Sequence, residues 1–420
     1  MRKLFILLLL PAQLIFAQNE VSLDNCYSWA RENYPSLKQA EIWQEITSLK
    51  KENTKTNFLP QVSLNGQVTY QSAVTKVDIA MPGISIPSVS KDQYKAYADF
   101  RQTIWDGGLT AANLELEDAV LKSNLSQVEV ELYKLNDQVA QAFFTVLAIN
   151  KQKSVLAAQK TTLQEQLKVV QSGIKNQVLE KSSALALEAE IINIEQNELQ
   201  LDAGKNTALK MLSILTGHTI SVDSKLEFQQ SAISPETQFT RPELQLFSNQ
   251  SVQLETQMNL LDKSRNPKVF GFGQAGYGRP GLNMLNDKFD SYYLVGLGLS
   301  WNVFDWKKTT RQKQVLQLQQ QTIQHQEETF MQNMNLLLAQ QSEQIDKLGK
   351  MLEKDNQLVE LKTEITKTTA SKLENGTINS AEYVRDLQAE TVSKINRELH
   401  QIQLDEAKEK YNLIKGKTKK

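Results

Sequence analysis

The chain has 420 residues, a formal net charge of −1 and a mean hydropathy of −0.42. A charge so close to neutral gives no electrostatic reason to expect a nucleic-acid partner. A single cysteine, Cys26, excludes an internal disulfide. After the N-terminus no apolar run reaches about 18 residues, which excludes an ordinary transmembrane helix.

The N-terminus has the composition of a secretory signal peptide. Arg2 and Lys3 precede an apolar run from Leu4 to Ala17 that is too short to span a bilayer. We predict a signal peptide over residues 1–17 and export past the inner membrane. Cys26 does not follow small residues at a cleavage site, so we expect a buried or free thiol there and not a lipid anchor; its role stays open.

The remaining chain contains one unit twice. Pro35 and Pro60 bracket one helical stretch, and Pro242 and Pro267 bracket another; 60 − 35 and 267 − 242 are both 25. Proline suits both the first turn of a helix and its end. We predict a first repeat over residues 18–230, a second over 231–414 that opens with a helix at 241–265, and a basic tail at 415–420.

Each bracketed helix is followed by an alternating pattern. Apolar residues interleave with polar ones from Gln61 to Thr69, which is typical of a strand with two different faces. We predict β-hairpins at 61–105 and 268–304. The second alternates less clearly, and its many glycines suggest close backbone approach or bends.

Long helices follow, predicted at 108–171 and 307–374, with return helices at 177–215 and 379–414. Nine apolar residues recur every seven positions in the first, a coiled-coil signal: Leu114, Leu121, Val128, Leu135, Ala142, Ile149, Leu156, Leu163 and Val170. We expect Gly173 and Gly376 to be matching left-handed caps where the long helices turn back.

Four strands cannot satisfy their own edges in lipid, so copies of the chain must complete a barrel. Two copies would give eight strands, with an interior filled by side chains, whereas three give twelve and leave a lumen. A homotrimer is therefore preferred. Aromatic residues should then mark the two membrane interfaces: Phe58, Trp105, Phe304 and Trp306 near the helices, and Tyr70, Tyr94, Tyr277 and Tyr292 near the loops.

This duplicated plan resembles the TolC family of bacterial outer-membrane efflux and export proteins. The motifs that carry the resemblance are Thr240-Arg241-Pro242-Glu243-Leu244, Phe58-Leu59-Pro60, Trp105-Asp106-Gly107-Gly108 with its partner Phe304-Asp305-Trp306, and Asn375-Gly376-Thr377. Trp306-Lys307 departs from the Gly-Gly of the first repeat, which should cost flexibility at that turn.

The resemblance implies a mainly α fold with β-strands. Four strands per chain would complete a 12-stranded trimeric transmembrane β-barrel, carried on a long antiparallel coiled-coil α-barrel. It also implies the outer-membrane channel of a tripartite efflux or type I secretion system, with its helical tunnel in the periplasm. Such a channel passively conducts substrates from a periplasmic adaptor and an inner-membrane pump to the exterior. Whether these are drugs, metals, peptides or proteins stays open.

The same resemblance places a periplasmic gate and the adaptor contact at the helical turns. The gate candidates are Glu382, Asp386, Arg385 and Glu180, and the docking-turn candidates are Gly173, Asn176, Gly376 and Asn379. A local interpretation competes, because Asn379 with Glu382 three residues later is a capping box that stabilises a helix start by itself.

We find no sequence support for catalysis. The three histidines are far apart without ligand-spaced partners, and no phosphate-binding glycine loop appears. We therefore predict no catalytic residue, cofactor, metal site or enzymatic activity. The alternative function is a periplasmic coiled-coil interaction protein, an adaptor or stalk without a pore. An adaptor should show one mid-chain hairpin between compact β-domains, and a stalk would leave the paired alternating segments unexplained.

Overall fold

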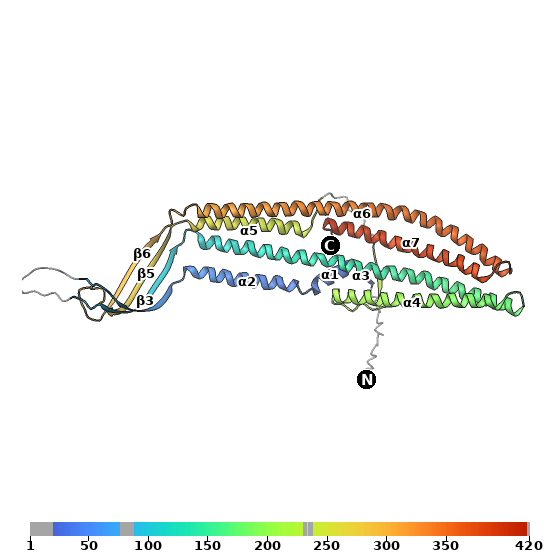
Figure 1. Ribbon diagram of the computed structural model, residues 1–420, viewed down its shortest axis with the longest axis horizontal. Coiled ribbons are helices and arrows are strands. Elements are labelled where there is room, and N and C mark those ends of the chain that lie inside the picture. The colour runs from blue at the N-terminus through green and yellow to red at the C-terminus, as the bar shows by residue number, and fades with distance from the viewer. Residues whose placement is uncertain (1–19, 76–87, 230–232, 234–237, 418–420) are drawn as a thin grey trace, which may run out of the picture. The chain divides into compact units, whose positions relative to one another are not determined.

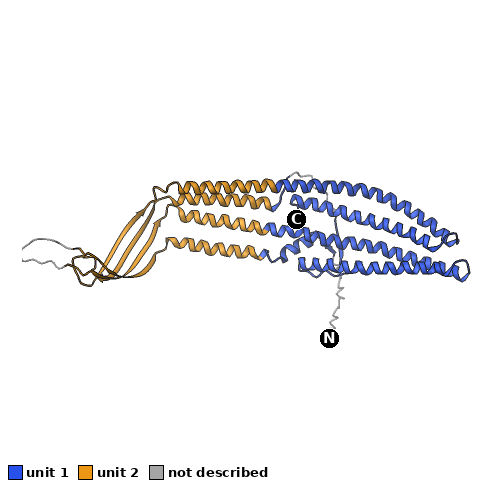
Figure 2. Ribbon diagram, viewed as in Figure 1, with its two compact units in different colours: residues 1–37, 129–242, 330–420 blue, residues 38–128, 243–329 orange. Residues whose placement is uncertain are grey.

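A computed structural model describes residues 20–75, 88–229, 233 and 238–417. The predicted signal peptide, the boundary at residues 230 and 231 and the last three residues of the predicted tail lie outside this part. The chain divides into two compact units (Figure 2). Unit 1 comprises residues 1–37, 129–242 and 330–420, and unit 2 comprises 38–128 and 243–329.

Unit 2 contains the antiparallel sheet. Its strands are β2 (Gln61–Tyr70), β3 (Asp92–Trp105), β5 (Lys268–Arg279) and β6 (Asp290–Ser300), in the order β2-β3-β5-β6 (Figure 1). The two hairpins are therefore joined through β3 and β5. Within the described chain, β2 and β6 each pair on one side only, which makes them the open edges of the sheet.

Helices lead into and out of this sheet. Those of unit 2 are α2 (Leu37–Lys55), the short η1 (Thr56–Phe58), α5 (Pro242–Ser264) and the first parts of α3 (Leu109–Lys175) and α6 (Lys308–Glu374). Exposed ion pairs join them, including Lys50 with Glu117 at 3.2 Å and Lys313 with Asp262 at 2.8 Å. Exposed pairs contribute about 0–1 kcal/mol each, so packing along the helices matters more than these charges.

Unit 1 is built around a mixed core. It contains β1 (Glu20–Ser22), α1 (Leu23–Asn33), α4 (Lys181–Thr216), β4 (Lys225–Glu227), α7 (Ser380–Lys415) and the remaining parts of α3 and α6. β1 pairs in parallel with β4. Phe144 of α3 is 1% exposed and meets Phe228 edge-on, with 4.8 Å between the ring centroids. Cys26 is fully buried in the same core, and burial raises the pKa of its thiol to about 12.

A second core cluster lies nearer the helical turns. Its most buried members come from α3, α4, α6 and α7: Leu163, Val170, Leu187, Ile194, Leu373 and Tyr383. The heptad positions Leu163 and Val170 are both fully buried, which explains why the seven-residue repeat persists this far along α3. Among the described residues, no helix combines the length and the apolarity needed to cross a membrane.

The two repeats keep a constant register through their helices. α3 and α6 both have 67 residues, and α4 and α7 both have 36. Leu109 corresponds to Lys308 and Thr216 to Lys415, an offset of 199 residues in both cases. The fold expected from the sequence, internally duplicated and with four strands in the antiparallel sheet, is confirmed.

The turn that leads from sheet to long helix differs in chemistry between the repeats but not in conformation. Gly107 and Gly108 have φ values of +73° and +86°, and their counterparts Trp306 and Lys307 have +53° and +60°. A left-handed conformation costs a residue with a Cβ atom roughly 1–2 kcal/mol. The second repeat therefore holds two strained residues where the first has two glycines.

Replacing Lys307 by glycine should raise the stability of the protein. We expect the free energy of unfolding to increase by about 1 kcal/mol, because glycine removes the steric cost at positive φ. Urea unfolding followed by helical circular dichroism measures it. Lys308→Gly is the matched control: Lys308 begins α6, so glycine there should be neutral or destabilising. A urea midpoint lower than that of wild type for Lys307→Gly would show that the backbone of Lys307 is not strained.

Candidate channel wall and helical turns

The strand register gives the sheet one apolar and one polar face. On β2 and β3 the apolar face pairs Val62 with Phe100 and Leu64 with Ala98. It continues through Gly273 of β5 to Val295 of β6. The polar face carries, among others, Ser63, Asn65, Tyr97, Asp99, Arg101, Gln274 and Tyr292.

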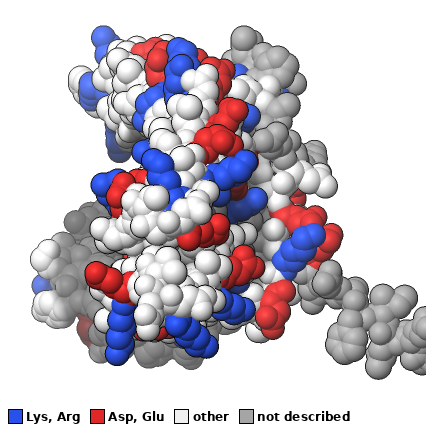
Figure 3. All heavy atoms as spheres, turned by 90° about the vertical axis from the view of Figure 1, so that its right-hand side faces the viewer, with Lys and Arg blue, Asp and Glu red and all other residues white. Residues whose placement is uncertain are grey.

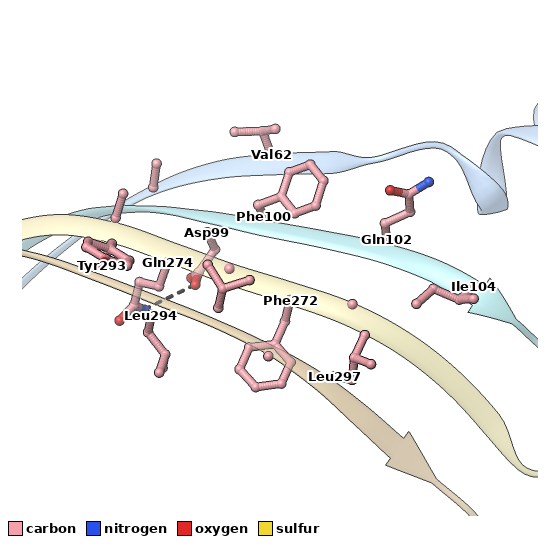
Figure 4. A pocket seen from close by; sticks show the side chains of 16 residues that line it. Val62, Asp99, Phe100, Gln102, Ile104, Phe272, Gln274, Tyr293, Leu294 and Leu297 are labelled. Atoms are coloured by element: carbon pink, nitrogen blue, oxygen red, sulfur yellow. Dashed lines mark hydrogen bonds between the residues drawn. The ribbon is translucent and has the colours of Figure 1, made fainter.

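The apolar face is open along both edge strands. Leu64 is 85% exposed and Val68 73%, and on the other edge Tyr293, Val295 and Leu297 are 76–78% exposed. Small residues in the middle of the face leave a shallow groove bordered by Phe100, Ile104 and Leu297 (Figure 4). An exposed apolar surface of this extent indicates contact with lipid or with another protein.

The polar face is organised by hydrogen bonds and by rings that lie over glycines. Asp99 accepts from Asn65 Nδ2 at 2.9 Å and from Gln274 Nε2 at 3.1 Å. A Cβ atom added at Gly296 would lie 2.6 Å from Cζ of Phe272, and one at Gly298 would lie 2.4 Å from Cζ of Phe270. The glycines of β6 therefore make room for these two rings, which is the close approach that the glycine-rich second hairpin predicted.

The candidate interface aromatics are mostly exposed, and most of those in the strands lie on the apolar face. Phe58, Trp105, Phe304 and Trp306 are 37–77% exposed, and Tyr70, Tyr94 and Tyr277 are 38–78% exposed. Tyr292 departs from this pattern. It pairs with Gly276 and lies on the polar face, whereas its neighbour Tyr293 lies on the apolar one.

An irregularity in the register places Trp105. The pairing of β3 with β5 shifts between Thr103 and Trp105, so that Trp105 pairs with Val269. Because Val269 lies on the apolar face, the bulge turns Trp105 toward that face as well. Strict alternation from Arg101 would have placed it on the polar one.

Gly173 and Gly376 are not equivalent positions of the two helical turns, contrary to the prediction from the sequence. Gly376 is left-handed at φ +70°, but its counterpart is Gln177 at φ +60°, and Gly173 lies inside α3. The hydrogen bonds match as well: Thr377 N donates to Lys372 O, and Val178 N to Gly173 O, both at 2.9 Å.

Gly173 has a packing role instead of a capping role. A Cβ atom there would lie 2.8 Å from Cδ1 of Leu179, so the missing side chain lets Leu179 fold back against α3. The other docking-turn candidates, Asn176 and Asn379, are both exposed. Val178 of the first turn lies next to Gly376 of the second, since a Cβ atom at Gly376 would be 3.7 Å from Cγ1 of Val178.

The gate candidates lie at the start of the return helices, with unequal surroundings. Asn379 caps α7 by accepting from Glu382 N at 2.9 Å, which supports the local capping interpretation. Glu382 and Arg385 are exposed, and the side chain of Asp386 is 17% exposed at 3.3 Å from the Arg385 guanidinium. Glu180 is the N-cap of α4 without a side-chain cap bond, and the constant offset makes it the counterpart of Asn379.

Charges of both signs mix at this end of unit 1. Figure 3 faces the side on which the helical turns lie in Figure 1, and Lys, Arg, Asp and Glu alternate across it without a large patch of one sign. The described residues there include Lys181 beside Glu180 and Arg385 beside Asp386. A partner for this surface would need matching polar and charged groups more than one strong opposite charge.

Asp106 and Asp305 start the two long helices in the same way. Asp106 accepts from Thr110 N at 2.7 Å and Gly108 N at 3.0 Å, and Asp305 accepts from Thr309 N at 3.0 Å. Burial works to raise the pKa of Asp106, but the hydrogen bonds from Thr110 and Gly108 outweigh it and lower the pKa below its usual value. The hydroxyl and backbone N–H of Thr309 lower the pKa of Asp305.

These caps should make stability depend on pH. A lowered folded-state pKa gives stability that is present above the unfolded pKa, about 3.9, and is lost as pH falls through the folded value. We expect wild type to be more stable than Asp106→Asn/Asp305→Asn at pH 7, with the difference shrinking as pH falls through the lowered folded-state pKa values. Urea midpoints measured across this range provide the test. A difference that persists at low pH would show that charge is not the cause.

Comparison with known proteins agrees with this geometry. Residues 26–218 match the family model described as outer membrane efflux protein. The structure is similar to that of the outer-membrane channel OprN, with a TM-score of 0.67 and 13% identity, covering 94% of this chain and 89% of that one. The comparison with curated proteins found no match.

Two further solved structures share the fold. VceC from Vibrio cholerae has a TM-score of 0.63 at 14% identity, covering 93% of this chain and 94% of that chain. The open-state MtrE channel from Neisseria gonorrhoeae has a TM-score of 0.63 at 15% identity, covering 94% and 88%. The duplicated helices and the two-faced sheet thus have the fold of these outer-membrane channels. The family match over residues 26–218 and the shared fold agree with the resemblance to the TolC family noted from the sequence.

Proposed function

We propose that three copies of this chain form the outer-membrane duct of a tripartite efflux or type I secretion system. The observation that carries the proposal is the sheet, with four strands, two open edges and opposite faces of different polarity. Pairing β2 of one copy with β6 of the next leaves no edge, and three copies give twelve strands around a lumen. The exposed apolar face then meets lipid, and the polar face lines the passage.

The helices belong in the periplasm in this assembly. Every strand connects to helices at the same end of the sheet, where Trp105, Phe304 and Trp306 lie, so the strands cross the membrane and the helices stay on one side. The exposed turns around Gly173, Asn176, Gly376 and Asn379 are the proposed contact for a periplasmic adaptor, which links the duct to an inner-membrane pump.

Cysteine cross-linking tests the trimer. Asn65→Cys on β2 is combined in turn with a cysteine at each polar-face position of β6, starting with Leu294→Cys. We expect at least one combination to give dimers and trimers in the outer-membrane fraction. Leu64→Cys, the adjacent residue on the opposite face, is the matched control and should not cross-link to the same positions. Chains that stay monomeric in all combinations, or that do not fractionate with the outer membrane, would refute the proposal.

Neutralising the gate candidates should open the duct. We propose that Glu382 and Asp386, with Arg385 and Glu180 beside the constriction, hold the periplasmic end nearly closed to ions. Glu382→Gln/Asp386→Asn should raise single-channel conductance in a planar bilayer, because the interactions that hold the constriction closed are lost, or change the preference for cations, because the charges that attract cations are gone. Glu360→Gln, an exposed acid elsewhere on α6, is the control. Unchanged conductance and selectivity would remove both residues from the gate.

A further inference from the structure

A cavity of about 550 Å³ lies on the polar face where the sheet meets the helices, entirely within unit 2. Gln61, Arg101, Thr103, Lys268 and Phe270 contribute to its wall, and Asp106 lies at its helical end. The volume is that of a site for a small organic molecule. None of these residues was a site candidate from the sequence.

The charge of the cavity favours an anion. Arg101 and Lys268 both line it, and in the described part of the chain neither forms a salt bridge. Asp106 is the opposing charge, but the residue is only 6% exposed, and its carboxylate accepts hydrogen bonds from the backbone N–H groups of Gly108 and Thr110. Its charge is therefore directed toward the helix terminus, which leaves the cavity with an excess of positive charge.

Phe270 orients the arginine. The Phe270 ring fills the space left by the missing side chain of Gly298, and the Arg101 guanidinium carbon is 4.2 Å from the ring centroid. A guanidinium stacked on an aromatic ring keeps its N–H fork free for a carboxylate or phosphate. Phe270 is thus a positioning residue, and Gly298 is the space that permits it.

We propose that this cavity is a binding subsite for organic anions that carry a carboxylate or phosphate group and pass through the duct. Arg101 and Lys268 bind the anionic group, and the hydroxyl of Thr103 and the amide of Gln61 complete the polar surroundings. The inference rests on the proposed function, because the polar face must border the passage for a substrate to reach the cavity. Three copies would place three such subsites around the lumen.

Block of ionic current by 1-naphthyl phosphate tests the subsite. For the full-length protein in a planar bilayer, we expect concentration-dependent block by this anion and none by neutral 1-naphthol. Arg101→Gln/Lys268→Gln should raise the half-blocking concentration at least about ten-fold, the effect of losing charge-assisted hydrogen bonds. Phe270→Leu should raise it by a smaller factor while preserving both cations.

The matched control is Lys95→Gln, which removes a cation from the same face near the loops, where Lys95 pairs with Gln67 and Gly278. It should change the half-blocking concentration less than about two-fold, since lumen charge far from the cavity acts only through screened long-range attraction. Equal block in wild type and the double variant, or an equal loss in Lys95→Gln, would overturn the subsite. So would wild-type channels that the anion does not block.

Calorimetric titration of 1-naphthyl phosphate into the detergent-purified chain gives an independent readout. Binding that disappears in Arg101→Gln/Lys268→Gln but persists in Lys95→Gln supports the subsite even where the gate keeps current low. Absence of heat with wild-type protein overturns it. A chain that neither trimerises nor conducts would refute the proposed function, whereas a conducting trimer that does not bind the anion would refute the subsite alone.

Discussion

Leu64→Arg should remove the protein from the outer membrane. Leu64 is 85% exposed in the middle of β2, on the face that meets lipid in the proposed trimer. An arginine on the lipid face near the bilayer midplane costs about 2–4 kcal/mol, and the trimer would carry three. We expect the variant to be depleted from the outer-membrane fraction and degraded, as measured by density-gradient fractionation and immunoblotting.

The adjacent residue provides a sharp control for this prediction. Ser63→Arg places the same side chain one position earlier, on the polar face and opposite Asp99. Because this face borders a water-filled lumen in the proposed trimer and Asp99 is an acidic neighbour, assembly should stay near the wild-type level. Similar depletion of both variants would show only that β2 tolerates no arginine. Normal assembly of Leu64→Arg would contradict the assignment of the apolar face to lipid.

Gly416→Ala should destabilise unit 1 strongly. Gly416 ends α7 at φ +91°, and a Cβ atom there would lie 2.5 Å from the backbone N of Arg241 and from the backbone C of Thr240. Neither atom can rotate away as a side chain could, and Thr240 N also donates to Lys415 O at 2.8 Å. Left-handed strain alone costs roughly 1–2 kcal/mol, so with this clash we expect a loss of about 3 kcal/mol or more.

Gly217, the counterpart of Gly416 in the first repeat, allows the cost of the left-handed conformation to be separated from the cost of the steric clash. Gly217 has φ +70°, but the atoms near its missing Cβ belong to the Asn33 side chain, which can move. Gly217→Ala should therefore lose only about 1–2 kcal/mol. Urea midpoints for the two variants, followed by helical circular dichroism, compare them directly. Equal losses would show that the close approach of Thr240 and Arg241 contributes nothing.

The sequence predicts this fold well where one physical pattern dominates. The alternation over 61–70 coincides with β2, and the heptad repeat from Leu114 to Val170 lies within α3. Both patterns arise because a strand or helix has one apolar side, so they can be recognised in the sequence without knowing what that side packs against. The strand β1 was not predicted, because its three residues form a strand only by pairing with β4.

Roles predicted for single residues were wrong where one residue type can serve two purposes, as glycine can either cap a helix or make room for a neighbouring side chain. Gly173 was predicted as a left-handed cap, but it provides space for Leu179, and the left-handed residue is Gln177. The offset of 199 residues between the repeats makes Ser183 the counterpart of the gate candidate Glu382. Tyr292 and Tyr293 were indistinguishable in a glycine-rich strand until the register with β5 separated their faces.

The polar cavity could not be predicted because it depends on contacts across strands. Arg101 and Phe270 are distant in sequence, and only the pairing of β3 with β5 brings the guanidinium over the ring. One signal was available: two phenylalanines alternate with glycines in β5, on the face that carries the polar residues of β3.

Because the helices of the two repeats have equal lengths, each long helix could pack against the return helix of either repeat during folding. α3 could return along α7 as well as α4, because the hairpins match in length and register. Buried carboxylates break this symmetry. Glu190 accepts from Gln388 Nε2 at 2.6 Å, and Glu390 from Thr363 Oγ1 at 3.0 Å and Lys394 Nζ at 2.6 Å. Lys394 lies on α7 with Glu390 and would stay with it in an exchanged hairpin, but Glu390 would lose the Thr363 hydroxyl of α6, so the native pairing keeps a hydrogen bond to a buried acid that the alternative lacks.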